Sequence, residues 1–463
     1  MTDQKCLFDN ETMKQFITNG FTVVKTDFPG EFHDEIYRRT SEAIAREGNP
    51  GNNLLPMVPQ IQQIYDHPKV KGALTSILGP DYIMHSHRHP HVNAPESIGG
   101  RWHKDSYWGY KKMRDHHPRW VMAMYYPQDV TVENGPTGVI PGTQYFETRP
   151  ENEDAAGIPM TGEAGSLIII HFDLWHRAYP NLSGNTRYMM KFQFTRMTEP
   201  TKGHWQKPAE QLALNGDAAD VRAPLWSNVW DWLSGSNGSS MAIPDTGITD
   251  IDRLSKELIS DSEPERLRAA YSLPLLGVDA VPVLMNGLRH ENDEVKRDAC
   301  YGLGPAGVPA IPELVGSLVD NNEMIRGYAA YALGDMGNDA EGAVPELVRL
   351  VGDSSDWVRR NVSEALGNIA ADAEASVPAL VQLMKDEDGQ VRFNSAYSLA
   401  KFGNQAREAV SVLQEGLGDE NRYVQGHSAA ALEKIGTTEA MNALLSLIHT
   451  SRWCPVTNKD TTF

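Results

Sequence analysis

The sequence predicts a multidomain protein in which an N-terminal β-rich domain of jelly-roll type, with flanking helices, precedes an all-α solenoid. Short apolar segments between residues 82 and 196 alternate with turns that contain glycine and proline, which is typical of double-sheet β proteins. After residue 280 a motif recurs every 30 to 33 residues, and such a period indicates stacked repeats. The chain of 463 residues is also longer than one hydrophobic core usually supports.

Composition limits the classes of function. The three cysteines are far apart, so we expect a reducing compartment and a cytoplasmic protein. No apolar run is long enough for a signal peptide or a membrane span. Residues 1–205 hold 21 Lys and Arg against 23 Asp and Glu, so 17 of the 19 excess negative charges belong to the rest of the chain. Such a surface repels nucleic acid and anionic membranes, and neither is expected as a partner.

The N-terminal half is expected to begin with helices and then become β-rich. Residues 8–75 are predicted to be mainly helical around one strand at 21–24. Further strands are expected at 82–91, 120–126, 166–170 and 185–194, where β-compatible residues are frequent. Asn134-Gly135-Pro136 predicts a turn, because glycine supplies backbone freedom that other residues lack.

A His-x-Asp pattern, His103 and Asp105, is the first candidate site. If these residues are extended, both side chains point to one face, because side chains in a strand alternate with a period of two. An imidazole from another strand, for which His176 is the candidate, would complete a two-His-one-carboxylate triad. Such a triad holds Fe(II) on one face and leaves positions open for a co-substrate and oxygen.

A second His-x-Asp pattern, His171 and Asp173, is a rival source of the pair. Its distal histidine would have to be His204, which lacks a strand context and a following arginine. The alternative role for His171 and Asp173 is to support His176, because metal-binding histidines usually need a second hydrogen-bond partner. Arg187 offers a planar guanidinium that grips a carboxylate with two hydrogen bonds, which suits a dicarboxylate co-substrate.

Residues 8–200 resemble the phytanoyl-CoA dioxygenase family of Fe(II)- and 2-oxoglutarate-dependent enzymes. The resemblance rests on ordered motifs at the family's spacing: His103-x-Asp105, the Glu-Asn-Gly-Pro run 133–136, the Ile-Pro-Gly-Thr run 140–143, His176 and Arg187. The run 16–24 also resembles the family's first helix and strand. The family's fold is the double-stranded β-helix, a jelly roll of the cupin type, which agrees with the short strands predicted above.

The resemblance implies a set of cofactors and ligands. The metal would be Fe(II), bound by the catalytic residues His103, Asp105 and His176. 2-Oxoglutarate would be anchored by Arg187, O2 would be the oxidant, and succinate and CO2 would be released. Asp105 favours hydroxylation or a related oxidation, because relatives that halogenate replace this carboxylate with a small residue.

Further contacts are expected around this centre. Some relatives have a hydroxyl residue two positions after the distal histidine, where this chain has Ala178, so Thr186 or an upstream residue would bind the co-substrate carboxylate instead. Tyr107 and Trp108 are candidates for the substrate wall.

The predicted strand at 82–91 carries a histidine at every second position, namely His85, His87, His89 and His91. A second metal site is the less favoured interpretation, because Pro90 would disturb a regular strand. The matching strand in the family borders the cavity. His87 and His89 are therefore expected to contact the substrate or 2-oxoglutarate.

The C-terminal half repeats itself in two registers. An Ala-Val-Pro-like tripeptide recurs at 280–282, 310–312, 343–345, 376–378 and 409–411, and a Val-Arg-like pair recurs before each Ala/Leu/Gly-rich stretch. The period is also compatible with ankyrin and tetratricopeptide repeats, but their signatures are absent. The recurring pattern resembles that of short HEAT-like repeats of paired helices, with prolines near the starts of the first helices.

These observations predict four segments and two hypotheses of function. The segments are an Fe(II)/2-oxoglutarate dioxygenase domain (1–233), a linker (234–248), a HEAT-like repeat domain (249–450) and a C-terminal tail (451–463). The first hypothesis is a dioxygenase acting on a small molecule, whose solenoid docks a protein partner or shapes substrate access. The alternative is a HEAT-repeat binding protein that carries a catalytically degenerate barrel.

Overall fold

The computed structural model describes residues 3–105, 113–214, 219–235 and 250–451. They form two compact units, divided near residue 210. The first contains the described residues up to 196 and residues 202–209, and the second contains residues 197–201 and the described residues from 210 to 450. The described residues between 210 and 233 therefore group with the helical unit, whereas the predicted boundary is residue 233. Most of the predicted linker and tail lies outside the described residues.

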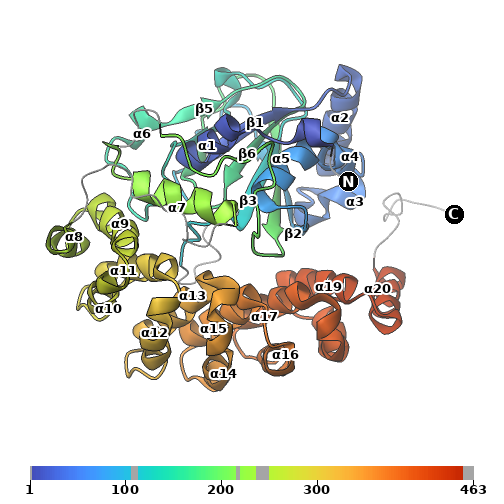
Figure 1. Ribbon diagram of the computed structural model, residues 1–463. Helices are drawn as coiled ribbons and strands as arrows, with labels where there is room; N and C mark the ends of the chain where they lie inside the picture. The colour runs from blue at the N-terminus through green and yellow to red at the C-terminus, as the bar shows by residue number, and fades with distance from the viewer. Residues whose placement is uncertain (1–2, 106–112, 215–218, 236–249, 452–463) are drawn as a thin grey trace. The chain divides into compact units, whose positions relative to one another are not determined.

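Two antiparallel sheets form the framework of the first unit (Figure 1). The larger sheet has the strand order β1-β6-β3-β8-β2, and the smaller one has the order β5-β4-β7. The strands are β1 Phe21–Lys25, β2 Tyr82–Asn93, β3 Trp120–Tyr125, β4 Thr137–Val139, β5 Ile158–Met160, β6 Ser166–His171, β7 His176–Ala178 and β8 Arg187–Arg196. β3, β6 and β8 are buried at every position, as expected of strands covered on both faces.

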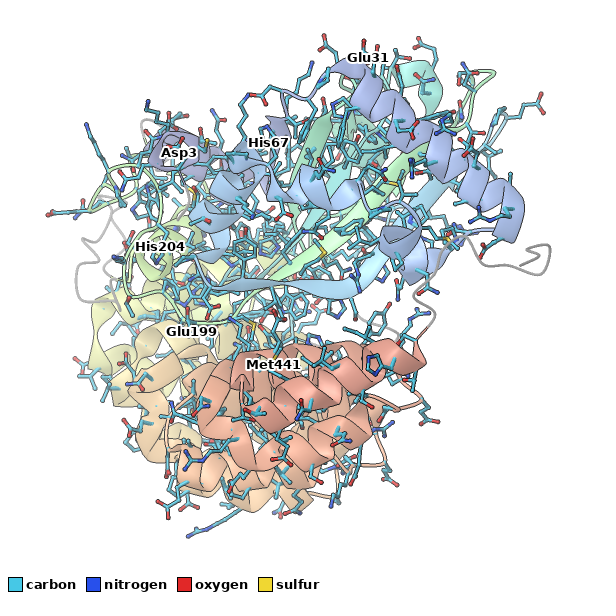
Figure 2. All side chains as sticks on the ribbon, turned by 90° about the vertical axis from the view of Figure 1, so that its right-hand side faces the viewer. Asp3, Glu31, His67, Glu199, His204 and Met441 are labelled. Atoms are coloured by element: carbon cyan, nitrogen blue, oxygen red, sulfur yellow. The ribbon has the colours of Figure 1, made fainter. Side chains whose placement is uncertain are left out.

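Helices flank the larger sheet. They are α1 Asn10–Asn19, α2 Gly30–Glu47, α3 Leu54–Met57, α4 Ile61–Asp66 and α5 Pro68–Leu78. The short helix α6 Glu153–Ala156 instead directly precedes β5 of the smaller sheet. Tyr65 of α4 reaches the sheet, with its hydroxyl 3.2 Å from the carbonyl oxygen of Met190. α2 buries Ile36 and Thr40 and exposes Glu31 at its first turn (Figure 2). Two sheets with flanking helices confirm the predicted double-stranded β-helix class.

Paired helices form the second unit (Figure 1). They are α7 Ala223–Leu233, α8 Ile251–Leu258, α9 Glu263–Ser272, α10 Val281–Leu288, α11 Asp293–Ala306, α12 Ile311–Ser317, α13 Glu323–Asp335, α14 Val344–Arg349, α15 Asp356–Ile369, α16 Ala373–Leu383, α17 Gly389–Phe402, α18 Val410–Gly416, α19 Arg422–Ile435 and α20 Thr438–Thr450. Each repeat pairs a first helix with a second, and second helices stack on one another from α11 to α19. The α-solenoid prediction is confirmed.

The repeat motif explains how neighbouring repeats join. Arg359, from the Val-Arg pair of one repeat, donates to Asp386 of the next at 2.6 Å, and Arg392 pairs with Asp419 at 2.8 Å in the same way. These side chains are about nine-tenths buried, so each carboxylate compensates a buried guanidinium. Pro378 differs from the expectation for repeat prolines, because Asp372 caps α16 earlier and Pro378 lies inside the helix.

Candidate metal centre

His103 and His176 face each other across a short antiparallel bridge. The amide of His103 donates to the carbonyl of His176 at 2.9 Å, and the reverse bond is 3.0 Å. Residues paired in this way have side chains on the same face. The two imidazole rings are accordingly 4.4 Å apart between centroids. His176 begins β7, whereas His103 lies in the loop before the segment 106–112.

Asp105 joins this pair from two residues beyond His103. Its Oδ1 lies 3.7 Å from Nε2 of His103 and 3.8 Å from Nε2 of His176. Ligand atoms of all three residues lie within 4.8 Å of one another, and no other group of this kind occurs in the described residues. The donor set, two imidazole nitrogens and one carboxylate oxygen, is that of a facial metal triad.

Both imidazoles are oriented by backbone carbonyls. Nδ1 of His103 lies 2.8 Å from the carbonyl oxygen of Arg101, and Nδ1 of His176 lies 2.9 Å from that of Leu174. An Nδ1–H that donates to a carbonyl leaves Nε2 as the lone-pair atom, which is the usual arrangement of metal-binding histidines. Burial lowers the pKa of His176 to about 4, so its Nε2 is unprotonated at neutral pH.

A cavity of about 300 Å³ opens beside these ligands. Residues of both sheets line it: His91 and Asn93 of β2, Met124 of β3, Thr137 of β4, His176, Arg177 and Ala178 of β7, and Arg187, Met189 and Lys191 of β8, together with His103 and residues near Gly99. A cavity between the sheets, with a ligand cluster in its wall, is a typical location for a small-molecule site.

Arg187 lies in this cavity as a buried cation without a carboxylate partner among the described residues. Its Nε and Nη2 donate to the carbonyl oxygen of Gly135 at 3.0 and 2.7 Å. Its Nη1 is buried and has no hydrogen-bond partner in the described part of the chain. Burial lowers the pKa of Arg187 from its ordinary value. A buried guanidinium with an unused donor fits the carboxylate of a dicarboxylate ligand.

The Asn-Gly-Pro turn explains why Arg187 is held in place. Gly135 has a φ of +68°, and a Cβ there would lie 2.3 Å from Nδ2 of Asn93 and 2.6 Å from the carbonyl oxygen of Tyr179. Only glycine accommodates both this backbone conformation and this packing. The turn thereby presents the Gly135 carbonyl to Arg187 and to Asn93, whose Nδ2 donates to it at 2.9 Å.

The structure adds residues that sequence reasoning missed. Lys191 lies on the cavity face of β8 and donates from Nζ to Oδ2 of Asp105 at 2.5 Å. Thr137 lines the cavity directly opposite Ala178 in the β4–β7 register. His91, which belongs to the row of alternating histidines in the predicted strand at 82–91, also lines the cavity, and burial lowers its pKa well below the ordinary value. Lys191 could have been found from the sequence, because it follows Arg187 by an even number of residues in one strand.

Other predicted residues are not among the described residues that line the cavity. Thr186 precedes β8, and its carbonyl accepts a hydrogen bond from the Tyr37 hydroxyl. It is not among the described residues that line the cavity. His89 pairs with Lys191 in the β2–β8 register, and His87 falls within an irregularity of β2 between residues 84 and 88. Tyr107 and Trp108 lie outside the described residues.

The rival pair takes no part in the cluster. Nδ1 of His171 accepts a hydrogen bond from the amide of Asp173 at 3.2 Å. The Asp173 carboxylate accepts one from Arg114 at 3.0 Å. The Leu174 carbonyl, and not Asp173, is the partner of the His176 ring.

A double-stranded β-helix domain with a candidate facial triad, followed by a helical repeat unit, defines the class of this protein. Its family follows from comparison with known proteins. Residues 32–189 match the phytanoyl-CoA dioxygenase family, and residues 251–334, 311–400 and 377–457 match HEAT repeats. The chain therefore carries a phytanoyl-CoA dioxygenase family domain and a HEAT-repeat domain, as the motifs predicted. The family match supports an oxygenase-type function.

Individual relatives are distant. Uncharacterized proteins of Mycobacterium bovis and Mycobacterium tuberculosis are each 27% identical over 193 residues, which is 40% of this chain and 67% of each relative. Among solved structures, the non-heme monooxygenase ThoJ in complex with nickel is 17% identical, with a TM-score of 0.35, over 42% of this chain and 85% of that chain. The non-heme alpha ketoglutarate dependent carbocyclase SnoK from nogalamycin biosynthesis is 14% identical, with a TM-score of 0.35, over 41% and 85%.

No described helix combines the length and the apolar character that a membrane crossing requires.

Proposed function

We propose that the N-terminal domain is an Fe(II)- and 2-oxoglutarate-dependent dioxygenase that hydroxylates a small organic substrate and releases succinate and CO2. The observation that carries the proposal is the convergence of His103 Nε2, His176 Nε2 and Asp105 Oδ1 beside a cavity that is lined by both histidines and by Arg187. Fe(II) bound there would supply oxygen activation coupled to decarboxylation of 2-oxoglutarate. Asp105 fills the third protein position, which favours hydroxylation over halogenation.

Different residues of the chain would bind the metal and the co-substrate. His103, His176 and Asp105 would hold the metal on one side and leave the cavity side for ligands. Arg187 would bind the distal carboxylate of 2-oxoglutarate through its unused Nη1. The Thr137 hydroxyl, opposite Ala178, would donate to the same carboxylate in place of the hydroxyl that Ala178 lacks. Met124 and Met189 would shield this contact from water, which strengthens charge-assisted hydrogen bonds.

Two measurements on the intact chain test the proposal. The first is succinate formation from 2-oxoglutarate with Fe(II), ascorbate and O2, alone and with a panel of small molecules. The second is the visible charge-transfer band of the anaerobic Fe(II)–2-oxoglutarate complex. We expect both signals in the wild type and neither in His103→Ala. His449→Ala, which removes an exposed histidine of α20, is the matched control and is expected to retain both.

The alternative, a binding protein with a degenerate barrel, predicts a different result. Neither the charge-transfer band nor succinate would then form in the wild type under any condition. A band without succinate would identify a barrel that binds the metal and co-substrate but lacks its substrate. A wild type without a band would refute the dioxygenase proposal.

For the HEAT-repeat domain we propose docking of a protein partner or control of substrate access. The acidic excess of the chain after residue 205 favours a partner with a basic contact surface. Binding of such a partner should weaken as ionic strength rises, because exposed charges are screened within about 10 Å at 0.1 M salt. A partner whose affinity does not change with salt would contradict the electrostatic part of this proposal.

A further inference from the structure

Lys191 is a buried cation that no motif accounts for. It lies on β8, paired with His89 of β2 and Met124 of β3, and its side chain is 6% exposed. Within the described residues its ammonium donates one hydrogen bond, to Oδ2 of Asp105. Burial of an ammonium group costs free energy unless the group is paired. The ion pair with Asp105 therefore offsets the cost of burying the Lys191 ammonium.

Because of this ion pair, the two carboxylate oxygens of Asp105 have different neighbours. Oδ1 lies 3.7 and 3.8 Å from the two imidazole Nε2 atoms, whereas Oδ2 is held by Lys191. A carboxylate can bind a metal ion through one oxygen or through both. With Oδ2 engaged by the ammonium, only Oδ1 is directed at the point where the imidazoles converge. A metal ion held by Oδ1 alone would keep open a coordination position that a bidentate carboxylate would occupy.

We propose that Lys191 is a positioning residue for the metal site: it keeps Asp105 a one-oxygen ligand, and its charge weakens the affinity of the site for divalent ions. The inference rests on the proposed metal-binding role of the triad. The positive charge of Lys191 repels a dication and neutralises much of the Asp105 charge at short range. The arrangement sacrifices metal affinity and retains the open position that 2-oxoglutarate needs.

A purely structural role for Lys191 predicts the opposite change in affinity. If Lys191 only held the Asp105 loop in place, its removal would loosen the ligand, and second-shell losses of that kind typically weaken metal binding 10- to 100-fold. The proposed role predicts that an uncharged side chain of similar length strengthens metal binding. The sign of the change in affinity therefore separates the two roles.

The test is anaerobic titration of the intact protein with Co(II), followed by its visible absorption, in Lys191→Met and Lys191→Gln. We expect both variants to bind Co(II) at least tenfold more tightly than the wild type. Lys191→Met should also change the Co(II) absorption before 2-oxoglutarate is added, and weaken subsequent 2-oxoglutarate binding. Lys191→Gln keeps a hydrogen-bond donor for Oδ2 and should retain the wild-type absorption. If Lys191→Met does not fold, Lys191→Gln carries the affinity comparison.

Two controls make failures distinguishable. Lys25→Met removes a half-exposed lysine of β1 that pairs with Glu163, and it should leave Co(II) affinity and absorption unchanged. If the wild type and His103→Ala bind Co(II) equally, the metal site itself is refuted and the role of Lys191 with it. If His103→Ala loses Co(II) but the Lys191 variants bind it no more tightly than the wild type, only the inference about Lys191 is overturned.

Discussion

Replacement of Arg187 by methionine tests the proposed co-substrate anchor most directly. The substitution keeps an apolar stem in the cavity and removes the guanidinium. The Gly135 carbonyl, which accepts from Nε and Nη2 of Arg187, retains the bond from Asn93 at 2.9 Å, so the turn should stay intact. The substitution should therefore mainly weaken ligand binding, because Nη1 is the buried donor without a partner in the described residues.

The magnitude follows from the bonds that a carboxylate would make. A hydrogen bond to a charged group contributes about 1.5–3 kcal/mol, and one or two such bonds to Nη1 would correspond to roughly 30- to 150-fold in affinity if they contribute about 2–3 kcal/mol in total. We therefore expect the KM for 2-oxoglutarate, and its Kd from the charge-transfer band, to rise by that factor in Arg187→Met, with Fe(II) binding retained.

The control for this prediction is Arg46→Met, which removes an arginine of α2 that is 42% exposed and pairs with Glu47. It should leave 2-oxoglutarate affinity unchanged. The reasoning would be refuted by an Arg187→Met protein that still binds 2-oxoglutarate within threefold of the wild type. Loss of Fe(II) binding in the same variant would show that Arg187 supports the fold of the site and is not a ligand anchor.

Two further predictions concern stability. Gly135→Ala places a Cβ 2.3 Å from Asn93 in a left-handed backbone conformation, so we expect a loss of about 2 kcal/mol or more, measured as a lower unfolding temperature; an unchanged temperature would contradict it. Burial lowers the pKa of His427 to about 3, against about 6.5 in the unfolded chain. Between these two pH values His427 is protonated in the unfolded chain but not in the folded one. The free energy of unfolding is therefore highest above about pH 6.5 and decreases as the pH falls toward 3. His427→Gln should flatten this fall by up to about 1.4 kcal/mol per pH unit in denaturant titrations, and an equal slope in both proteins would count against it.

The pairing of His103 with Asp105 was predictable because it depends on a local rule, whereas the contact with His176 joins distant parts of the chain. His103 and Asp105 are two residues apart, so alternation predicts both side chains on one face. His176 reaches that face through its antiparallel bridge with His103. The same rule would have found Lys191, since Arg187 and Lys191 are four residues apart in β8. Lys191 was missed because it belongs to none of the family motifs, whereas Arg187 does.

Long-range register was not predictable. Thr137 lies opposite Ala178 only because β4 and β7, some forty residues apart, pair in one particular register, and a shift of one residue would turn Thr137 to the other face. The expected disturbance at Pro90 did not occur, because β2 is an edge strand and Pro90 pairs with Met190 inside the ladder. An edge position tolerates the missing N–H of proline. The irregularity lies instead between Met84 and Arg88.

The two cations of β8 make the two ends of the cavity chemically different. Arg187 and Lys191 share one face, and four residues of strand separate their Cα atoms by about 13 Å. Lys191 is neutralised by Asp105 at the metal end, whereas Arg187 has no carboxylate partner in the described residues. If the proposed function holds, a dicarboxylate in the cavity would be drawn to Arg187 with one end and would direct its other end to the point where the imidazoles converge. Because one strand carries both cations, a single register would set both the position of Asp105 and the orientation of the proposed co-substrate.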